Sequence, residues 1–206
     1  MATTDRTARD HPRTDTRARR AAGGGTSPTT AALLGTAAAG VAVGIAAMLG
    51  RKLVVQAPTL LAGDWDKALA TEHRMVEKIF DALEATTTSN TTKRTILLTQ
   101  MKHALAKHAL QEENAVYPAL RDAGQAEDAD QLNAEHGYVK QYLYELTNCP
   151  KDSERFLDIV RQFRAHIEKH VREEEDELFP ALKAKLSAEQ NATLTKAMNK
   201  EGLKLA

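Results

Sequence analysis

The sequence has few of the residues on which several classes of protein depend. Only one of its 206 residues is cysteine, one is tryptophan, and 4% are aromatic. A single cysteine excludes both a disulfide-stapled scaffold and a zinc cluster built from thiolates. Lysine plus arginine and aspartate plus glutamate both number 28, so the chain lacks the basic excess typical of nucleic-acid-binding proteins. We therefore expect no nucleic-acid partner, while the 42% of hydrophobic residues predict one domain with a core of its own plus additional segments.

The net charge of zero is the sum of two unlike parts. Residues 1–30 hold six arginines and three aspartates but almost no large apolar side chain. The run GGGTSP at residues 23–28 cannot hold a regular element, so we expect residues 1–30 to form a disordered basic leader. Two further basic residues stand at positions 51 and 52, which leaves a net charge of −5 for residues 64–206. The mild acidity therefore belongs to the part of the chain that is expected to fold.

Residues 31–50 contain no charged side chain, and basic residues flank them on both sides. Twenty apolar residues are the length that a helix needs to cross a bilayer, which predicts a single-pass transmembrane helix followed by a linker over residues 51–63. Gly40 and Gly44 lie four positions apart, a spacing that lets helices approach closely in lipid and predicts a homo-oligomer through this face. Eight alanines and four glycines make the segment only weakly hydrophobic, so a soluble helix packed on a partner is the alternative. We expect a membrane protein whose folded domain is cytoplasmic, with a soluble cytoplasmic protein as the alternative.

From Gly63 onward, apolar residues recur every three or four positions in four stretches. This spacing is typical of amphipathic helices that bury one face. The polar loops between them cover residues 85–93, 122–129 and 147–153, each short enough to join antiparallel neighbours. The pattern predicts an all-α protein with an up-down-up-down four-helix bundle over residues 64–183. Ser187 and Gln190 have the spacing of a capping box, which predicts a short fifth helix within a C-terminal region over residues 184–206.

Six polar residues stand where the helical pattern calls for a large apolar side chain. Each predicted helix has one histidine in its apolar stripe, and two of these histidines have a glutamate four residues later, on the same helix face. Six buried groups without partners would cost about 1–3 kcal/mol each, and more if charged. These residues are His73, His108, Glu112, His136, His170 and Glu174.

The two HxxxE motifs belong to an internal repeat. Residues 108–120 align with residues 170–182 at an offset of 62, and Glu72-His73 aligns with Glu135-His136 at an offset of 63. Imidazole nitrogens with carboxylate oxygens suit iron, manganese or zinc, and bundle interiors commonly hold such sites. A purely structural hydrogen-bond network is the alternative, but it would not need the repeated symmetry. The repeat therefore predicts a dinuclear metal site between two similar helical hairpins.

The pattern His73, His108-x3-Glu112, His136, His170-x3-Glu174, with the continuations EExxVYPAL and EExxLFPAL, resembles the hemerythrin-like family, also called the HHE cation-binding domain. The resemblance covers about residues 64–183 and implies a non-haem di-iron site inside an up-down four-helix bundle. It implies that His73 and His108 bind one iron, that His136 and His170 bind the other, and that Glu112 and Glu174 bridge them. No separate catalytic residue is predicted.

Two departures from the oxygen-carrying members change the expected chemistry. Lys140 stands where those members have a second histidine of an HxxxH motif, and Glu174 follows its histidine by four residues where they have an aspartate at five. The predicted site is therefore more symmetric, with more open metal positions. The resemblance implies a protein that binds or senses O2, NO, peroxide or iron through two non-haem iron ions, with manganese or zinc as less favoured metals. The alternatives are a di-iron oxidoreductase that consumes peroxide or NO, and a non-redox structural or storage module for divalent metals.

The neighbours of the predicted ligands receive simpler interpretations. We interpret His166 as a histidine at the edge of the buried stripe. The alternative is that it donates a hydrogen bond to a metal ligand or replaces one. Tyr117 and Phe179 precede prolines and are interpreted as core residues. Glu113 and Glu175 lie about 100° from the bridging glutamates on a regular helix, which predicts a solvent-exposed position for both.

Overall fold

The computed structural model describes residue 50, residue 52 and residues 54–206. The predicted leader and all of the predicted transmembrane segment except its last residue, Gly50, lie outside the described residues, as do Gly40 and Gly44. Within the described part of the chain, no helix combines the length and the apolar character needed to cross a bilayer. The structure therefore lends no support to a membrane anchor or to an oligomer through the glycine face, and both stay predictions from the sequence.

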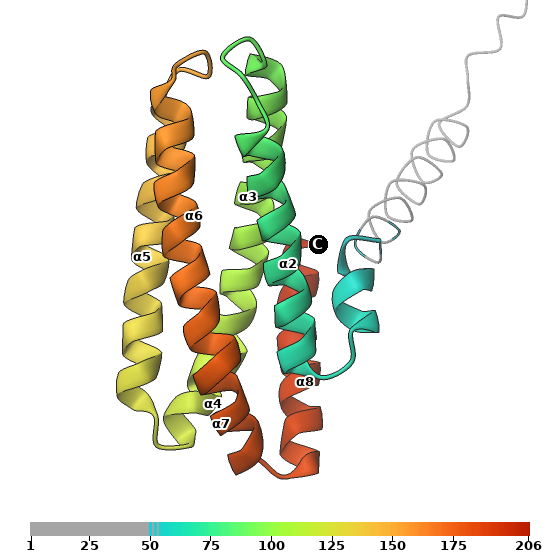
Figure 1. Cartoon of the computed structure of the whole chain (residues 1–206). Helices are drawn as coiled ribbons and strands as arrows, with labels where there is room; N and C mark the ends of the chain where they lie inside the picture. Colours follow the sequence, from blue (N-terminus) through green and yellow to red (C-terminus); the bar gives the residue numbers. More distant parts are fainter. Residues whose placement is uncertain (1–49, 51, 53) are drawn as a thin grey trace, which may run out of the picture. The chain divides into compact units, whose positions relative to one another are not determined.

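Four long helices run side by side and form the predicted all-α bundle (Figure 1). Two loops lie together at one end of the bundle, and the shorter helices α4 (Tyr117–Asp122) and α7 (Phe179–Lys185) lie at the other. No strand occurs among the described residues. The long helices are α2 (Trp65–Glu84), α3 (Thr91–Gln111), α5 (Ala126–Asn148) and α6 (Arg155–Glu173).

A π-helical turn follows α3 and another follows α6, at matching places in the repeat. The first, η1, covers Glu112–Val116 and leads into α4, and the second, η2, covers Glu174–Leu178 and leads into α7. In each, the carbonyl of the first glutamate accepts a hydrogen bond from the N–H five residues later. Such turns insert one extra residue into a helix and occur frequently at functional sites. The duplicated sequence therefore produces a duplicated distortion, which begins at the two glutamates predicted as bridging ligands.

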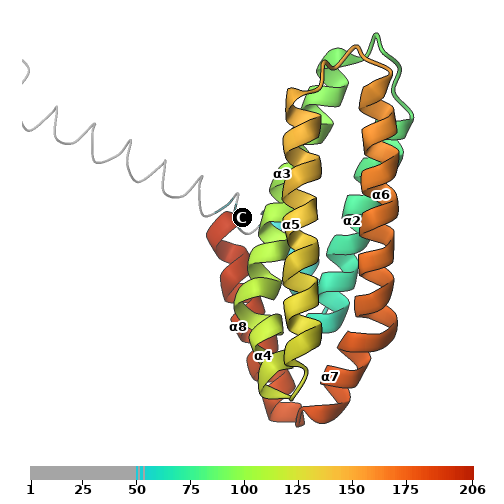
Figure 2. The ribbon, with the colours of Figure 1, turned by 90° about the vertical axis from the view of Figure 1, so that its left-hand side faces the viewer.

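The C-terminal helix is longer than predicted. Helix α8 spans Ala188–Leu205, 18 residues, so the prediction of a short fifth helix was wrong. Its predicted start is confirmed, because Ser187 and Gln190 form a reciprocal capping box. Only Leu194, Met198 and Gly202 are buried along it, and so sparse a stripe gave a weak helical signal. The helix turns back and packs on α2, α3 and η1 (Figure 2).

The segment predicted as a linker is itself largely helical. Residues 54–61 form a helix that lies against α8, where the Gln56 amide donates a hydrogen bond to Asn199 Oδ1 at 3.1 Å. Lys52 Nζ donates to the carbonyl of Leu203 at 2.9 Å. Gly63, with a φ of 99°, adopts the left-handed conformation that glycine favours just before α2 begins. The two ends of the described chain therefore cover the same side of the bundle.

The hydrophobic core is divided into two clusters by a polar layer. The cluster toward the two loops contains Phe80, Met101 and Phe163, and the other contains Trp65 and Phe179. All of these side chains are almost completely buried. The predicted ligand residues lie between the two clusters, so apolar packing on either side holds the layer in place.

Candidate metal centre

The six residues predicted as ligands come together in the buried layer. The four histidines come one from each long helix, and the two glutamates are the first residues of η1 and η2. None of the six residues is more than 5% exposed. Their donor atoms form two groups that could hold metal ions and that share Glu112: one comprises His73, His108, Glu112 and Glu174, and the other comprises Glu112, His136 and His170.

Each inner glutamate reaches a histidine in both halves of the layer. Glu112 Oε1 lies 3.1 Å from His108 Nε2, and its Oε2 lies 3.3 Å from His136 Nε2. Glu174 Oε2 lies 3.4 Å from His73 Nε2, and its Oε1 lies 3.4 Å from His170 Nε2. Every histidine therefore turns its Nε2 atom toward the centre of the layer, where the carboxylates stand between the two pairs.

A second ring of glutamates holds the outer nitrogen of each histidine. Each of the four Nδ1 atoms lies within 3.3 Å of a carboxylate oxygen from a neighbouring helix. Such a partner fixes the tautomer and the orientation of a metal-binding imidazole and leaves Nε2 free to bind. The pairs are Glu175 with His73 at 2.7 Å, Glu72 with His108 at 3.3 Å, Glu113 with His136 at 3.0 Å, and Glu135 with His170 at 2.8 Å.

The interpretation of Glu113 and Glu175 as solvent-exposed was only partly right, because their side chains are 31% and 32% exposed but each also contacts an imidazole nitrogen. The 100° rotation that placed them outside holds for a regular α-helix, whereas both lie in π-helical turns. The repeat itself contained a signal, because Glu72 and Glu135 precede a predicted ligand and Glu113 and Glu175 follow one. Four carboxylates in duplicated positions beside ligands indicate a shared role more strongly than helical periodicity indicates exposure.

The carboxylates raise the affinity of several of these histidines for protons in the metal-free protein. Burial lowers the pKa of His170, but the charge of Glu174 and the hydrogen bond with Glu135 raise it to about 9. Burial raises the pKa of Glu72, but the hydrogen bond with His108 lowers it to about 2. A metal ion that binds imidazole nitrogen must displace such protons.

Tyr117, interpreted from the sequence as a core residue, places its hydroxyl group in the centre. The hydroxyl donates to Glu174 Oε1 at 2.9 Å and lies 3.1 Å from His136 Nε2. Burial and the charges of the two inner glutamates raise its pKa well above the usual value. Phe179 occupies the equivalent place in the repeat and stacks on the ring of His73 at 6.4 Å. The tyrosine–phenylalanine difference was visible in the sequence, but its consequence needed the structure.

The other residues singled out in the sequence lie outside the two donor groups. The His166 ring packs against the rings of Tyr138 and Tyr142, at 5.6 and 5.9 Å between centroids. Lys140, the departure from the oxygen carriers, is 70% exposed and lies 3.6 Å from Glu113. Its ammonium group thus faces the outer ring and not the inner donors.

A small apolar cavity adjoins the four histidines. Its volume is about 20 Å³, and its remaining walls come from aliphatic side chains: Val76, Leu105, Ala109, Val139, Ile167 and Val171. A cavity of roughly 10–15 Å³ on this measure holds one water molecule. The space therefore suits a molecule of two or three atoms.

The residues of the layer fit bound cations. Buried atoms that lack a hydrogen-bond partner among the described residues include Glu112 Oε1, Glu174 Oε2 and His170 Nε2, and such atoms are costly unless something else binds them. The inner and outer glutamates and the lysines that pair with them have a formal charge of −3, because six carboxylates face three ammonium groups: Glu72, Glu112, Glu113, Glu135, Glu174 and Glu175 with Lys107, Lys140 and Lys169. Cations at the Nε2 atoms would satisfy both the unpartnered atoms and the excess charge.

Comparison with known proteins identifies a family of cation-binding domains, in agreement with the donor groups described above. Residues 66–182 match the family described as the hemerythrin HHE cation binding domain. An uncharacterised hemerythrin-like protein of Schizosaccharomyces pombe is 27% identical over 128 residues, which are 60% of this chain and 62% of that protein. A DNA nickase of Nostoc sp. is 34% identical over 91 residues, 44% of this chain but only 26% of that protein. The chain thus spans less than two thirds of either relative. No solved structure matches.

Proposed function

The chain belongs to the hemerythrin HHE cation-binding family, and on that premise we propose that its bundle holds two non-haem iron ions and binds or senses O2, NO or peroxide. His73 and His108 would hold one ion, His136 and His170 the other, and Glu112 and Glu174 would bridge them. Bound iron would supply open coordination positions and electrons to the small ligand.

The observation that carries this proposal is the orientation of the four imidazoles. Each Nδ1 atom faces an outer carboxylate, and each Nε2 atom lies 3.1–3.4 Å from an oxygen of an inner carboxylate. A structural hydrogen-bond network would not need all four rings to point their second nitrogen at the same two glutamates. Two oxygens of one carboxylate directed at two separate histidine pairs form the arrangement that a bridging ligand requires.

The side chains of this protein would control access and protons at the centre. The aliphatic walls of the cavity exclude bulk water from the histidine side of the layer. On the other side, the Tyr117 hydroxyl holds a proton beside Glu174 Oε1 and within 3.1 Å of His136 Nε2. The cavity volume of about 20 Å³ favours diatomic ligands and peroxide over organic substrates.

Metal analysis tests the proposed centre. Protein from an iron-supplied host should contain about two iron ions per chain, as two donor groups predict. His108→Ala should lose metal, whereas the matched variant His103→Ala should keep it, because His103 lies outside both donor groups. Zinc as the only metal, or the same metal content in both variants, would contradict the proposal.

Absorption spectra then separate binding from turnover. The iron-loaded protein should change its spectrum on addition of NO or peroxide, and the change should reverse when a bound ligand is removed. Continued disappearance of the ligand over many equivalents would favour the oxidoreductase alternative. No spectral change with either NO or peroxide would favour the storage alternative.

A further inference from the structure

Glu72 and Glu135 occupy equivalent places in the repeat, and each holds the Nδ1 atom of a histidine on the next helix. Glu72 supports His108 at 3.3 Å, and Glu135 supports His170 at 2.8 Å. Their second oxygens meet very different surroundings. This difference is not encoded in the repeat, because it comes from segments outside it.

The carboxylate of Glu72 is enclosed by buried donors. Thr59 Oγ1 donates to its Oε1 at 2.6 Å, and Lys107 Nζ lies 2.9 Å from the same atom. The amide of Gln111, with its NH2 group turned toward Glu72, donates to Oε2 at 2.8 Å. Thr59 and Gln111 are 0% exposed and Lys107 is 4% exposed, so this network is shielded from solvent.

The two ends of the described chain seal this network. Thr59 belongs to the helical segment 54–61, and α8 lies directly over Gln111. A Cβ atom at Gly202 would lie 2.8 Å from the outer atom of the Gln111 amide and 2.8 Å from Gln56 Nε2, so a side chain at this position would require both buried amides to move. The cover over Glu72 is therefore packed without space for an additional methyl group.

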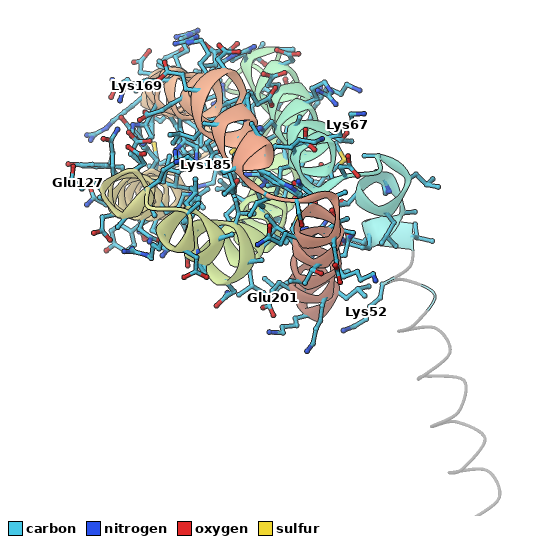
Figure 3. All side chains as sticks on the ribbon, turned by 90° about the horizontal axis from the view of Figure 1, so that it is seen from below. Lys52, Lys67, Glu127, Lys169, Lys185 and Glu201 are labelled. Atoms are coloured by element: carbon cyan, nitrogen blue, oxygen red, sulfur yellow. The ribbon has the colours of Figure 1, made fainter. Side chains whose placement is uncertain are left out.

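Glu135 has a far more open partner. Its Oε1 atom accepts a hydrogen bond from Lys169 Nζ at 3.3 Å, and the Lys169 side chain is 66% exposed. Figure 3 shows Lys169 at the outer edge of the bundle, far from Glu201 of α8. An exposed ammonium group on a flexible stem holds a carboxylate weakly, whereas a buried network of donors holds it in one position.

The two groups of inner donors also differ in the number of their members, and the larger group again belongs to the α2–α3 half. The group that contains His73 and His108 has four donors within 4.8 Å of one another, and the group that contains His136 and His170 has three. The Tyr117 hydroxyl contacts His136 Nε2 of the second group and Glu174 Oε1 of the first. The number of inner donors and the enclosure of Glu72 thus both favour the α2–α3 half, whereas the Nδ1 contact itself is shorter for Glu135, at 2.8 Å, than for Glu72, at 3.3 Å.

We propose that Thr59, Lys107 and Gln111 act through Glu72 as positioning residues for His108. As a result, the position formed by His73 and His108 holds its cation more firmly than the position formed by His136 and His170, which exchanges first. The inference rests on the proposed dinuclear site. Its physical basis is that a ligand held by an ordered partner cannot easily rotate away from the metal, and changes to such partners typically alter metal affinity by about 10–100-fold.

The test measures how fast each ion leaves the protein. The full chain is loaded with Fe²⁺ without oxygen, and an excess of a colour-forming chelator is added. We expect two phases of equal amplitude that differ in rate by about tenfold or more. His73→Ala should remove the slow phase, and His136→Ala should remove the fast one. Thr59→Val should speed the slow phase by about tenfold without changing the fast phase, and Thr59→Ser should restore the slow rate.

Thr99→Val is the matched control, because its hydroxyl group is exposed and bonds only its own helix at the carbonyl of Thr95. A single phase for both ions, or a fast phase that disappears in His73→Ala, would overturn the inference whether or not Thr59→Val folds. Equal acceleration of both phases by Thr59→Val would overturn the role of Thr59. Binding of only one ion would contradict the dinuclear proposal; the inference then stands if His73→Ala abolishes that binding and His136→Ala does not, and fails in the converse case.

Discussion

The α2–α3 hairpin and the α5–α6 hairpin contribute the same kinds of donor to the centre but are covered by different parts of the molecule. Each supplies two histidines, a π-helical turn that begins at an inner glutamate, and two outer glutamates. The first hairpin is sealed by residues 54–61 and α8, while the second leaves Lys169 exposed. A duplicated sequence thus produces a duplicated inner shell, and the segments outside the duplication make the two halves unequal.

The largest expected effect comes from removing the metal ions from both halves of the centre. Loss of both ions should leave the excess negative charge of the layer balanced only by protons, and it should strongly lower the melting temperature. A ligand present at 1,000 times its dissociation constant stabilises the folded state by about 4 kcal/mol. Thermal unfolding of metal-loaded and chelator-treated protein, followed by circular dichroism, measures this difference. Equal melting temperatures would show that the layer does not bind these ions tightly.

The next prediction concerns the glutamate that both halves share. Glu112 belongs to both donor groups, so Glu112→Ala should reduce the bound metal from two ions to none. His170→Ala, which alters one group only, should leave one ion. Metal content per folded chain, measured after removal of excess metal, distinguishes the two results. Retention of one ion by Glu112→Ala would show that the two positions do not depend on a common bridge.

Substitution of one glycine in α5 and one in α8 compares how tightly the two helices are packed. Alanine is normally about 0.8–1.0 kcal/mol more favourable than glycine inside a helix. A Cβ atom added at Gly137 in α5 would meet nothing within 4 Å beyond its own stretch of helix, so Gly137→Ala should stabilise the protein by about that amount. In Gly202→Ala the new methyl group would meet Gln111 and Gln56 at 2.8 Å, and overpacking of this kind costs about 1–3 kcal/mol. Urea unfolding of the two variants should give changes of opposite sign.

Removal of the Tyr117 hydroxyl group should make the two halves of the centre more alike. Tyr117→Phe gives α4 the same first residue that α7 already has. Loss of the hydrogen bond to Glu174 should lower the unfolding free energy of the metal-free protein by about 1 kcal/mol. It should also alter the absorption spectrum of the iron-loaded protein, while Tyr144→Phe, at an exposed ring, should change neither quantity. An unchanged spectrum in Tyr117→Phe would show that the hydroxyl group does not affect the iron site.

The last prediction concerns the pH dependence of the stability of the metal-free protein. The pKa of His170 is raised from 6.5 to about 9, so its contribution to stability is complete below pH 6.5 and is lost as the pH rises through 9. The pKa values of Glu72 and Glu135 are lowered from 4.5 to about 2, so their contributions are complete above pH 4.5 and are lost as the pH falls through 2. Metal-free protein should therefore be most stable between about pH 4.5 and 6.5.

Metal binding should have the opposite trend above that range, because cations compete with protons for the imidazoles. The stabilisation by metal should grow as the pH rises from 6 to 9, and metal uptake near pH 7 should release protons into a weakly buffered solution. Melting temperatures across this range, with and without metal, check both trends. A metal effect that does not vary with pH would contradict proton competition at these histidines.

Much of the fold and the inner part of the site could be predicted from the sequence, for reasons that are local. The stripe that contains His73, Val76 and Phe80 indicates which face of one helix is buried, and the spacing from His108 to Glu112 puts both side chains on one face. The outer glutamates were missed because Glu113 lies in a π-helical turn, to which an angle calculated for an α-helix does not apply. The length of α8 was missed because only Leu194, Met198 and Gly202 are buried along it, and a glycine adds no apolar side chain to the helical stripe.

By itself, the sequence determined the identity of the inner donors, their faces on the helices and their duplication, because these depend on residue type and on a period of 3.6 residues. Only the tertiary structure decided which carboxylate holds which imidazole, since each such pair joins two helices whose relative rotation and register are set by packing. It also decided that Thr59 and Gly202, near opposite ends of the described chain, enclose Glu72 in one half of the centre, whereas Glu135 in the other half pairs with the exposed Lys169. A contact between residues so distant in the chain has no local signal, because it forms only when the whole bundle is packed.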